Sequence, residues 1–364
     1  MQNILVVNAG SSSIKLAVFA PDLEMQLSAE ASGIGGTGRL RVGDSRQETA
    51  LATHALAFDK LLEQLAARGF TPGSLAAAGH RVVHGGESLT RPELVTPEVL
   101  AEIGHCARLA PLHNPHNAAA IRALADLMPQ LPQVACFDTA FHAANPEPAL
   151  RYALPGRPET QGIRRYGFHG ISYAALVRRW PEVTGTALPK RLLAMHLGNG
   201  ASLCAIREGR SVATTMGYSP LEGLTMGTRA GSIDGNAVLA LAETLGVDGA
   251  RRLLNHESGL LGLSGLSPDM RALEAADTPA ARFAIEHFCY WAARHAGSMI
   301  AAMEGIDAIA FTGGIGENAA AIRADITKRL AWAGLPDGAV NVIPADEERQ
   351  IAWHTRNTLD LPGT

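Results

Sequence analysis

Two arginines and one aspartate stand in segments of the sequence that would hold their side chains firmly. Arg81 lies within the glycine-rich stretch 79–86, Arg229 is flanked by small residues in 226–231, and Asp138 directly follows a short apolar run. A guanidinium on a stiff segment can grip a carboxylate or a phosphoryl group with two hydrogen bonds. An aspartate at the end of a strand is suited to binding a metal ion. These residues indicate chemistry on anions, although either arginine alone could be an exposed side chain beside a turn.

Three glycine-rich turns point to phosphate. They occupy residues 10–13, 198–200 and 313–316. Without a Cβ, each exposes backbone N–H groups to an approaching oxyanion. None matches the G-x-x-x-x-G-K-[ST] loop or a clean G-x-G-x-x-G fingerprint. Each turn alone could be structural, but the three together favour a nucleotide phosphotransferase.

The remaining candidates are histidines and one further acid. His113, His169 and His196 each sit at a turn between apolar residues, where a structural and a catalytic role both remain open. Glu347 begins the last expected helix, where a charge that favours the helix N-terminus is the competing explanation. Because Mg²⁺ takes one or two carboxylates plus phosphate oxygens and water, Asp138 and Glu347 would suffice for it. The sequence lacks the H-E-x-x-H and Ser-His-Asp patterns of metalloproteases and serine hydrolases.

A repeated hairpin is expected to position these residues. Strand, polar turn and strand follow one another from Ile4 to Phe19, and the same order recurs from Leu192 to Ile206. When Ile4 is laid on Leu192, Asn8 falls on His196 and Gly10 on Gly198. The match indicates a duplicated domain. The pattern predicts helices over 53–68, 114–127 (with Asn114 as its cap) and 278–304 and another from about 346, and strands over 133–137 and 306–311.

Composition sets the outer limits. The chain has 364 residues, 47% hydrophobic and 18% charged, which excludes global disorder and suggests two domains. We place these domains at 1–150 and 151–364, with a linker near 146–162, and leave open whether the last helix packs on the first. A net charge of −4 without long runs argues against a nucleic-acid or membrane partner. Four scattered cysteines exclude a Cys-based zinc site and predict a cytoplasmic location.

Seven segments together resemble the acetate kinase family, in the superfamily of acetate and sugar kinases, heat-shock chaperone ATPases and actin. They are residues 8–15, 80–87, 137–142, 166–170, 196–200, 220–229 and 311–318. The resemblance implies an α/β fold of two duplicated actin-like ATPase (ribonuclease H-like) domains around a central cleft. It implies reversible, direct in-line phosphoryl transfer from ATP to acetate, giving ADP and acetyl phosphate. It further implies Mg²⁺, with Mn²⁺ as a substitute, and a homodimer.

The resemblance also implies a role for individual residues. Asp138, His169 and Arg229 match catalytic positions, and Asn8 and Glu347 match magnesium positions. The acetate site is matched by Arg81, Val83, Leu112, His113, Phe168 and Pro220. The nucleotide site is matched by Lys15, His196, Leu197, Gly198, Asn199, Gly200, Asp269, Met270, Arg271, Gly314, Ile315, Gly316, Glu317 and Asn318. Since a carboxylic acid is ionised at neutral pH, the acceptor needs no general base, so we interpret Asp138 as orienting a metal ion or water.

The sequence departs from the family at three places and leaves rival functions open. Gly235 replaces a usual proline, Tyr173 a common histidine, and Ala345-Asp346 precede Glu347 in place of Thr-Asn. The nearest rival is a propionate or other short-chain acyl kinase, although a β-branched Val83 would shorten the pocket. A rival of another class is a chaperone-like or actin-like ATPase without a small acceptor, which would give Arg81, Phe168 and Pro220 no role. Pyrophosphate as donor also stays open.

Overall fold

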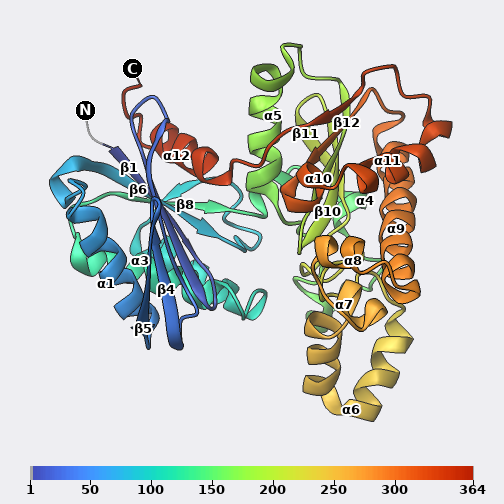
Figure 1. Ribbon diagram of the computed structural model, residues 1–364, viewed down its shortest axis with the longest axis horizontal. Coiled ribbons are helices and arrows are strands. Elements are labelled where there is room, and N and C mark those ends of the chain that lie inside the picture. The colour runs from blue at the N-terminus through green and yellow to red at the C-terminus, as the bar shows by residue number, and fades with distance from the viewer. Residues whose placement is uncertain (1–2, 364) are drawn as a thin grey trace. The chain divides into compact units, whose positions relative to one another are not determined.

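The computed structural model describes residues 3–363, which form two compact units (Figure 1). The first unit runs to Phe141 and includes the chain from Asp346 on, and the second is His142–Ala345. The division at 150 and 151 stays a prediction about domains. The stretch 146–162 belongs to the second unit: Tyr152 hydrogen-bonds Glu222 there, and Arg165 lies over the Tyr152 ring at 4.1 Å.

The first unit is built on a mixed sheet with the strand order β5-β4-β3-β2-β1-β6-β8-β7. The strands are β1 Asn3–Ala9, β2 Ser13–Phe19, β3 Met25–Ser32, β4 Gly36–Val42, β5 Ser45–Leu51, β6 Leu75–Val82, β7 Glu93–Leu94 and β8 Gln133–Phe137. β1 pairs antiparallel with β2 and parallel with β6, and β6 is parallel to β8. The carboxyl ends of β1, β6 and β8 therefore meet at one edge of the sheet.

Helices cover both faces of this sheet. They are α1 His54–Ala66, α2 Pro97–His105, α3 Asn114–Leu127 and α12 Glu347–Thr358. α1 and α3 bury Phe58, Leu61 and Leu124 in one core with Leu5 and Val7. α12 packs against β6 on the other face. The last helix of the chain thus returns to the first unit, which answers the question the sequence left open.

Two sites show why these helices lie where they do. A Cβ on Gly79 would stand 2.2 Å from Thr355 Oγ1, so a glycine in β6 is what lets α12 approach. The expectation that Asn114 caps α3 is wrong, because His113 is the N-cap and Asn114 is buried within the helix. Its amide instead accepts from the His84 N–H at 3.1 Å and donates to the His84 carbonyl at 2.9 Å.

The second unit repeats the same strand plan. Its sheet has the order β11-β10-β9-β12-β13, with β9 Arg191–Leu197, β10 Ala201–Arg207, β11 Arg210–Thr214, β12 Ala308–Thr312 and β13 Val340–Val342. β9 is antiparallel to β10 and parallel to β12, as β1 is to β2 and β6. The predicted duplication of an actin-like α/β fold is confirmed.

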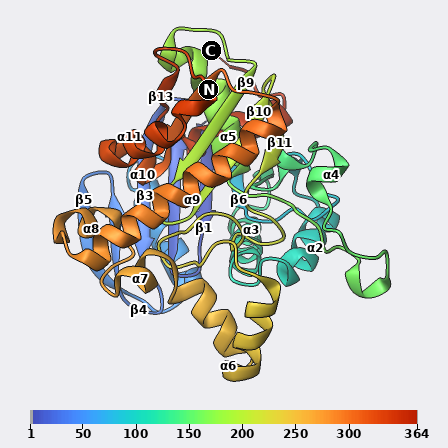
Figure 2. The ribbon, with the colours of Figure 1, turned by 90° about the vertical axis from the view of Figure 1, so that its right-hand side faces the viewer.

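The second unit also contains helices, of which α5, α9 and α10 contact its sheet. The helices of this unit are α4 Glu147–Leu150, α5 Gly170–Thr184, α6 Gly235–His256, α7 Gly259–Ser264, α8 Met270–Ala276, α9 Pro279–Met303, α10 Gly313–Asn318 and α11 Ala320–Arg329. α9 begins where predicted, with Thr278 accepting from the Ala281 N–H at 3.2 Å, and lies across β10 (Figure 2). α6 starts at Gly235 without a proline, but Asp234 caps it by accepting from the N–H groups of Asn236 and Ala237.

Residues 313–316 form helix and not the expected turn. They begin the short helix α10, which follows β12 directly. Gly313 takes a positive φ of 79°, and a Cβ there would meet the Leu197 carbonyl oxygen at 2.8 Å. The glycine therefore permits an abrupt change from strand to helix.

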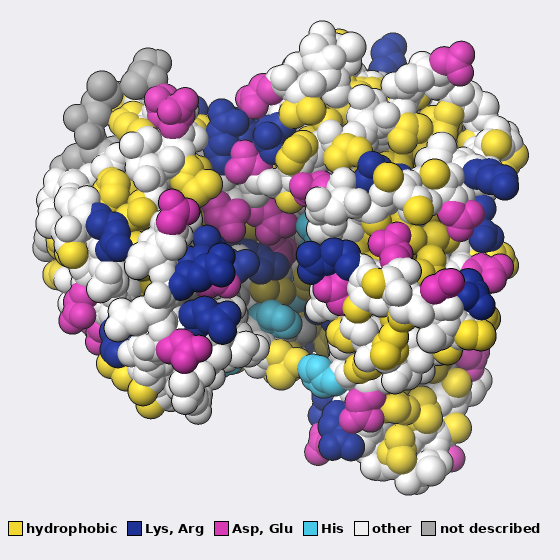
Figure 3. Space-filling view, in the orientation of Figure 1, with side chains coloured by type: hydrophobic (Ala, Val, Ile, Leu, Met, Phe, Trp, Pro, Cys, Tyr) yellow, Lys and Arg dark blue, Asp and Glu magenta, His cyan; other side chains and the backbone are white. Residues whose placement is uncertain are grey.

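The surface carries both signs of charge. Acidic and basic side chains are interspersed over the visible face of each unit (Figure 3). Over residues 3–363, no helix is long and apolar enough to cross a bilayer.

Candidate functional site

Charged and polar side chains form a row across three adjacent strands of the first unit. Asn8 of β1 lies opposite Lys15 of β2, and Arg81 of β6 donates from Nη1 to Asn8 Oδ1 at 3.3 Å. Because side chains alternate along a strand, Arg81 shares the face of Gly79, which is covered by α12. Asp138 follows β8, whose Cys136 lies opposite Arg81. Four sequence candidates thus gather at the carboxyl ends of parallel strands.

Arg81 is paired to Asp138 by a forked contact. Nη2 lies 2.6 Å and Nε 3.1 Å from Asp138 Oδ2. The aspartate side chain is only 3% exposed and the arginine side chain 24%, so this pair is shielded from water. The sequence placed both residues at the site, but nothing in it indicated that they bind each other. The fork uses the Nε–H and one Nη2–H, and Asn8 accepts from one Nη1–H, so one N–H of Nη1 and one of Nη2 remain for an anion.

Glu347 enters this group from the first turn of α12. Burial raises its pKa to about 7, and the charges of Asp138 and Glu348 add to this, while Arg81 and Lys15 act the other way. For Arg81 itself, burial would lower the pKa, but Asp138 and Glu347 outweigh it and the pKa rises. The acids and the arginine therefore share one electrostatic environment.

The oxygen atoms in this group suit magnesium. Asn8 offers an amide oxygen, and Asp138 and Glu347 offer carboxylates, which are the hard donors that Mg²⁺ prefers. Residues 3–363 contain no cluster of three or more His, Cys, Asp or Glu side chains able to hold a metal ion. Mg²⁺ usually keeps several waters and binds substrate phosphate oxygens, so it takes few ligands from a protein.

Val83, in the segment after β6, is one of three first-unit residues expected to bind acetate. Val83 is buried, and its N–H donates to Asn117 Oδ1 at 3.1 Å. The side-chain amide of Asn117 also donates from Nδ2 to the Ala9 carbonyl at 2.7 Å. Asn117 therefore connects this segment to the turn after Asn8. Sequence reasoning missed Asn117. Of the other two candidates, Leu112 is 50% exposed and His113 is the N-cap of α3.

In the second unit, His169 and Arg229 converge on Gly200. A Cβ on Gly200 would lie 3.4 Å from His169 Nε2 and 3.5 Å from Arg229 Nη1. The His169 ring stacks on His196, with centroids 4.2 Å apart and planes 25° apart. Arg229 also donates to the Pro220 carbonyl at 3.1 Å. The absent side chain of Gly200 thus leaves a space lined by one nitrogen of His169 and one of Arg229.

The segment that carries Phe168 and His169 is anchored by a buried histidine. His142 Nε2 lies 2.9 Å from the Phe168 carbonyl, and Nδ1 lies 2.8 Å from Ser211 Oγ. Burial lowers the pKa of His142 to about 4, although the bond to Phe168 opposes this. His142 is therefore neutral and donates from Nε2. The Phe168 side chain is itself only 2% exposed.

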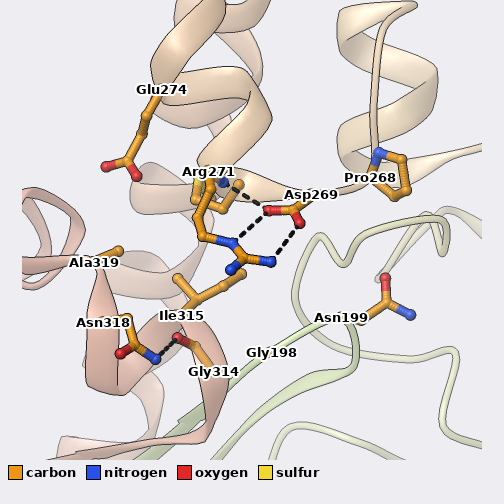
Figure 4. Close-up of a pocket in the computed structure, with 11 residues that line it drawn as sticks. Gly198, Asn199, Pro268, Asp269, Arg271, Glu274, Gly314, Ile315, Asn318 and Ala319 are labelled. Atoms are coloured by element: carbon orange, nitrogen blue, oxygen red, sulfur yellow. Dashed lines mark hydrogen bonds and ion pairs between the residues drawn. The ribbon is translucent and has the colours of Figure 1, made fainter. Parts of the chain in front are cut away.

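A cavity of about 600 Å³ opens in the second unit (Figure 4). It is lined by Gly198, Asn199, Pro268, Asp269, Met270, Arg271, Glu274, Gly314, Ile315, Asn318 and Ala319. Asp269 caps α8 by accepting from the Arg271 N–H at 2.9 Å and pairs with the Arg271 guanidinium at 3.0 Å. The size of the cavity and the glycines in its lining suit a nucleotide.

Eight of the predicted nucleotide-binding residues line this cavity and the others do not. Pro268, Glu274 and Ala319 were missed, since no motif marked them. Leu197 and Gly316 are buried instead, and Glu317 accepts from the N–H groups of Gly313 at 3.0 Å and Ala345 at 2.9 Å. His196 and Gly200 lie with His169, and Lys15 belongs to the first unit.

Known proteins resemble the chain over almost its full length. The family model described as "Acetokinase family" matches residues 3–357. A protein of Nitrobacter hamburgensis named acetate kinase is 43% identical over 391 residues, covering 99% of this chain and 96% of that protein. One of Rhodopseudomonas palustris with the same name is 46% identical over 394 residues, covering 98% of each.

Two solved structures also match the fold of the chain over nearly its full length. The crystal structure of Porphyromonas gingivalis acetate kinase has a TM-score of 0.90 at 34% identity, covering 99% of this chain and 100% of that one. The crystal structure of a propionate kinase from Francisella tularensis has a TM-score of 0.92 at 35% identity. The match covers 98% of this chain and 100% of that one.

Proposed function

Since the chain belongs to the acetokinase family, we propose that it transfers the γ-phosphoryl group of ATP reversibly to acetate, giving ADP and acetyl phosphate. The observation that carries this proposal is the row of Lys15, Asn8 and Arg81 beside the buried Asp138. Such a row can hold a carboxylate and neutralise a phosphate. A chaperone-like ATPase without a small acceptor would have no use for it.

The reaction must bring two anions together. Acetate, with a pKa of roughly 4–5, is already ionised at neutral pH, so no side chain has to remove a proton. Arg81 binds and orients the carboxylate, and Lys15 contacts the nucleotide phosphates. Arg229 and His169 donate to the equatorial oxygens of the phosphoryl group during a single in-line transfer.

Asp138 acts by position. Its carboxylate holds the Arg81 fork at 2.6 Å and stands beside the proposed metal ligands. It therefore orients the guanidinium and a metal ion or water and does not carry a proton.

Magnesium fits the oxygens of Asn8 and Glu347, with Mn²⁺ as a substitute. Bound there with ATP, it supplies positive charge to the phosphate oxygens. The half-buried Glu347 would then stay ionised, because a nearby cation lowers the pKa of a carboxyl group.

A nucleotide donor is favoured over pyrophosphate because the second unit provides a cavity of about 600 Å³. That volume accommodates a nucleoside as well as phosphates. Gly314 lines the cavity, and a Cβ there would meet no atom within 4 Å, so the rim is open.

The acceptor is tested by measuring acyl phosphate as its hydroxamate with ATP and Mg²⁺. We expect kcat/KM for acetate to exceed that for propionate by about tenfold or more, because a buried Val83 limits the pocket. Propionate is the alternative acceptor, since one relative of known structure is named a propionate kinase. A higher kcat/KM for propionate would assign it that role, and no acyl phosphate from either acid would contradict the proposal.

The chain is proposed to act as a cytoplasmic homodimer. α6 and α9 expose apolar side chains, including Leu239, Val247, Phe283 and Tyr290, all more than half exposed, and apolar side chains are visible over α6 in Figure 3. Such surface is expected to be covered by a second copy. The four cysteines are buried free thiols, which suits a reducing compartment. Light scattering that gives about 38 kDa, the mass of one chain, at micromolar concentration would contradict the dimer.

A further inference from the structure

We propose that Tyr173 and Ser202 are positioning residues that hold the His169 imidazole with its Nε2–H group directed at the space over Gly200. The inference rests on the role proposed for His169 above. It starts from a chain of hydrogen bonds: Tyr173 Oη lies 2.5 Å from Ser202 Oγ, which lies 2.9 Å from His169 Nδ1.

Burial makes this chain obligatory. Tyr173 and Ser202 are both completely buried, so neither hydroxyl group can exchange its partner for bulk water. Loss of a partner would leave a polar atom unsatisfied, which destabilises a protein more than a surface hydrogen bond stabilises it. Burial also raises the pKa of Tyr173 well above its ordinary value, so the phenol keeps its proton.

The direction of the two bonds follows from acidity. A phenol is a stronger acid than an aliphatic hydroxyl, so Tyr173 donates to Ser202 Oγ. The Ser202 proton is then directed at His169 Nδ1, which must accept it. In a neutral imidazole with an accepting Nδ1, the ring proton is on Nε2.

That proton faces the space where the second unit gathers its donors. His169 Nε2 lies 3.4 Å, and Arg229 Nη1 3.5 Å, from the position of a Cβ on Gly200. With the proton on Nε2, both groups offer N–H to an oxyanion above Gly200. With the other tautomer, Nε2 would present a lone pair and repel it.

The first turn of α5 holds a second imidazole in the same way. Ser172 Oγ lies 2.8 Å from His196 Nδ1, and the His196 ring stacks on His169 with centroids 4.2 Å apart. The stack prevents the His169 ring from turning over, while Ser202 fixes its tautomer. Adjacent residues of one helix thus orient both rings.

The experiment compares Tyr173→Phe and Ser202→Ala with the matched control Tyr166→Phe. Tyr166 is also a buried tyrosine, and its hydroxyl donates to the Gly162 carbonyl at 2.9 Å. With ¹⁵N-labelled histidine, the His169 signals are assigned by their loss in His169→Gln. Wild type and control should show an unprotonated Nδ1 and a protonated Nε2. Tyr173→Phe and Ser202→Ala should show averaging of the two tautomers.

The kinetic expectation is specific as well. In both variants kcat should fall roughly tenfold, as for the loss of one hydrogen bond, with the acetate and ATP KM values within twofold of wild type. Ser202→Thr, which keeps Oγ, should recover the tautomer and most of the rate. Tautomer signals in Tyr173→Phe and Ser202→Ala identical to wild type would overturn the proposal, even if the rates fell.

The two proposals fail separately. Full acetate kinase turnover by His169→Gln would refute the catalytic role of His169 in the proposed function. The tautomer spectra would still decide whether Tyr173 and Ser202 orient the ring.

Discussion

The guanidinium of Arg81 serves three partners at once: a buried carboxylate, the amide of Asn8 and the anion it is proposed to bind. Lysine keeps the charge but cannot form the fork. We predict that Arg81→Lys raises the acetate KM at least tenfold and leaves the ATP KM within twofold. The matched control is Arg191→Lys, which changes a forked pair with Asp307 in the second unit and should leave both constants unchanged. An unchanged acetate KM in Arg81→Lys would remove this residue from the acetate site.

Gly200 tests the other group of donors. A Cβ there meets nothing closer than 3.4 Å, so Gly200→Ala should fold with a thermal midpoint close to that of wild type. The methyl group would nevertheless occupy the space between His169 and Arg229. We predict that kcat falls by roughly a hundredfold, comparable to removing one preorganised donor. Turnover within threefold of wild type would show that the transferred group does not enter this space.

Residue types marked most of these residues as candidates but did not predict their partners. Arg81, Arg229 and Asp138 were singled out because arginine on a stiff segment and aspartate at a strand end favour chemistry on anions and metal ions. The residue type of His169 left a structural role open, and the family resemblance supplied its expected catalytic role. The Arg81–Asp138 pair, the Asn117 bridge and the Tyr173–Ser202 chain were missed, since each joins residues of different elements. Such contacts depend on strand order and register, which spacing in one segment does not contain.

At the level of elements, α5 begins on a backbone conformation that histidine rarely adopts. His169, its N-cap, has φ 56° and ψ 22°, in the left-handed region. An L-residue there costs about 1–2 kcal/mol that glycine avoids. We predict that His169→Gly is more stable to urea than His169→Ala by about 1 kcal/mol, although both lose the imidazole. Equal stabilities would mean that the left-handed conformation is not maintained in solution.

The packing of α12 on β6 can be tested by a substitution in the strand. A Cβ on Gly79 would lie 2.2 Å from Thr355 Oγ1 and 2.7 Å from Ile351 Cγ2. We predict that Gly79→Ala lowers the free energy of unfolding by about 1–3 kcal/mol through overpacking, measured by urea denaturation. Gly104→Ala in α2, where a Cβ meets no atom within 4 Å, is the control and should be neutral or stabilising. If both changes were neutral, α12 would not pack on β6 as described.

The elements themselves were largely predictable, because caps and periodicity are local. Thr278 caps α9 as expected, α1 lies within the predicted range 53–68, and β8 has the predicted bounds. The errors occurred where tertiary contacts decide. The Asn114 side chain binds the backbone of His84 and does not cap α3. The glycines of α10 form a helix that begins directly after the last residue of β12.

Over the whole molecule, one sheet plan carries two different sets of side chains. Asn8 and Lys15 face each other in the first hairpin, and His196 and Ser202 do so in the second. Arg81 in the first sheet has its counterpart in Thr312, which pairs with His196. The duplication was visible in the sequence as matching turns, but the division of roles required the register.

Buried histidines predict how the stability of the molecule depends on pH. Burial lowers the pKa of His80, His84 and His142 to about 4, against 6.5 for an exposed histidine. Below pH 6.5 the unfolded chain therefore binds protons that the folded chain does not, and stability falls until about pH 4. At about 1.4 kcal/mol per unit of pKa, each histidine accounts for up to roughly 3 kcal/mol.

Urea midpoints of wild type at pH 7 and pH 5 measure this effect. The midpoint should be lower at pH 5. Between pH 7 and pH 5, the urea midpoint of His142→Asn should fall by less than that of wild type. The control is His105→Gln, which changes a histidine whose side chain is 78% exposed. Its urea midpoint should fall by as much as that of wild type. A wild-type midpoint that does not fall would contradict neutral burial of these rings.

The central claim is that the phosphoryl group passes from nucleotide to acetate and not to water. The direct test is the ratio of acetyl phosphate to ADP formed in one reaction as acetate is increased from zero. We predict almost no ADP without acetate, and one acetyl phosphate for each ADP at saturating acetate. ADP release that is independent of acetate and accompanied by inorganic phosphate would contradict the account.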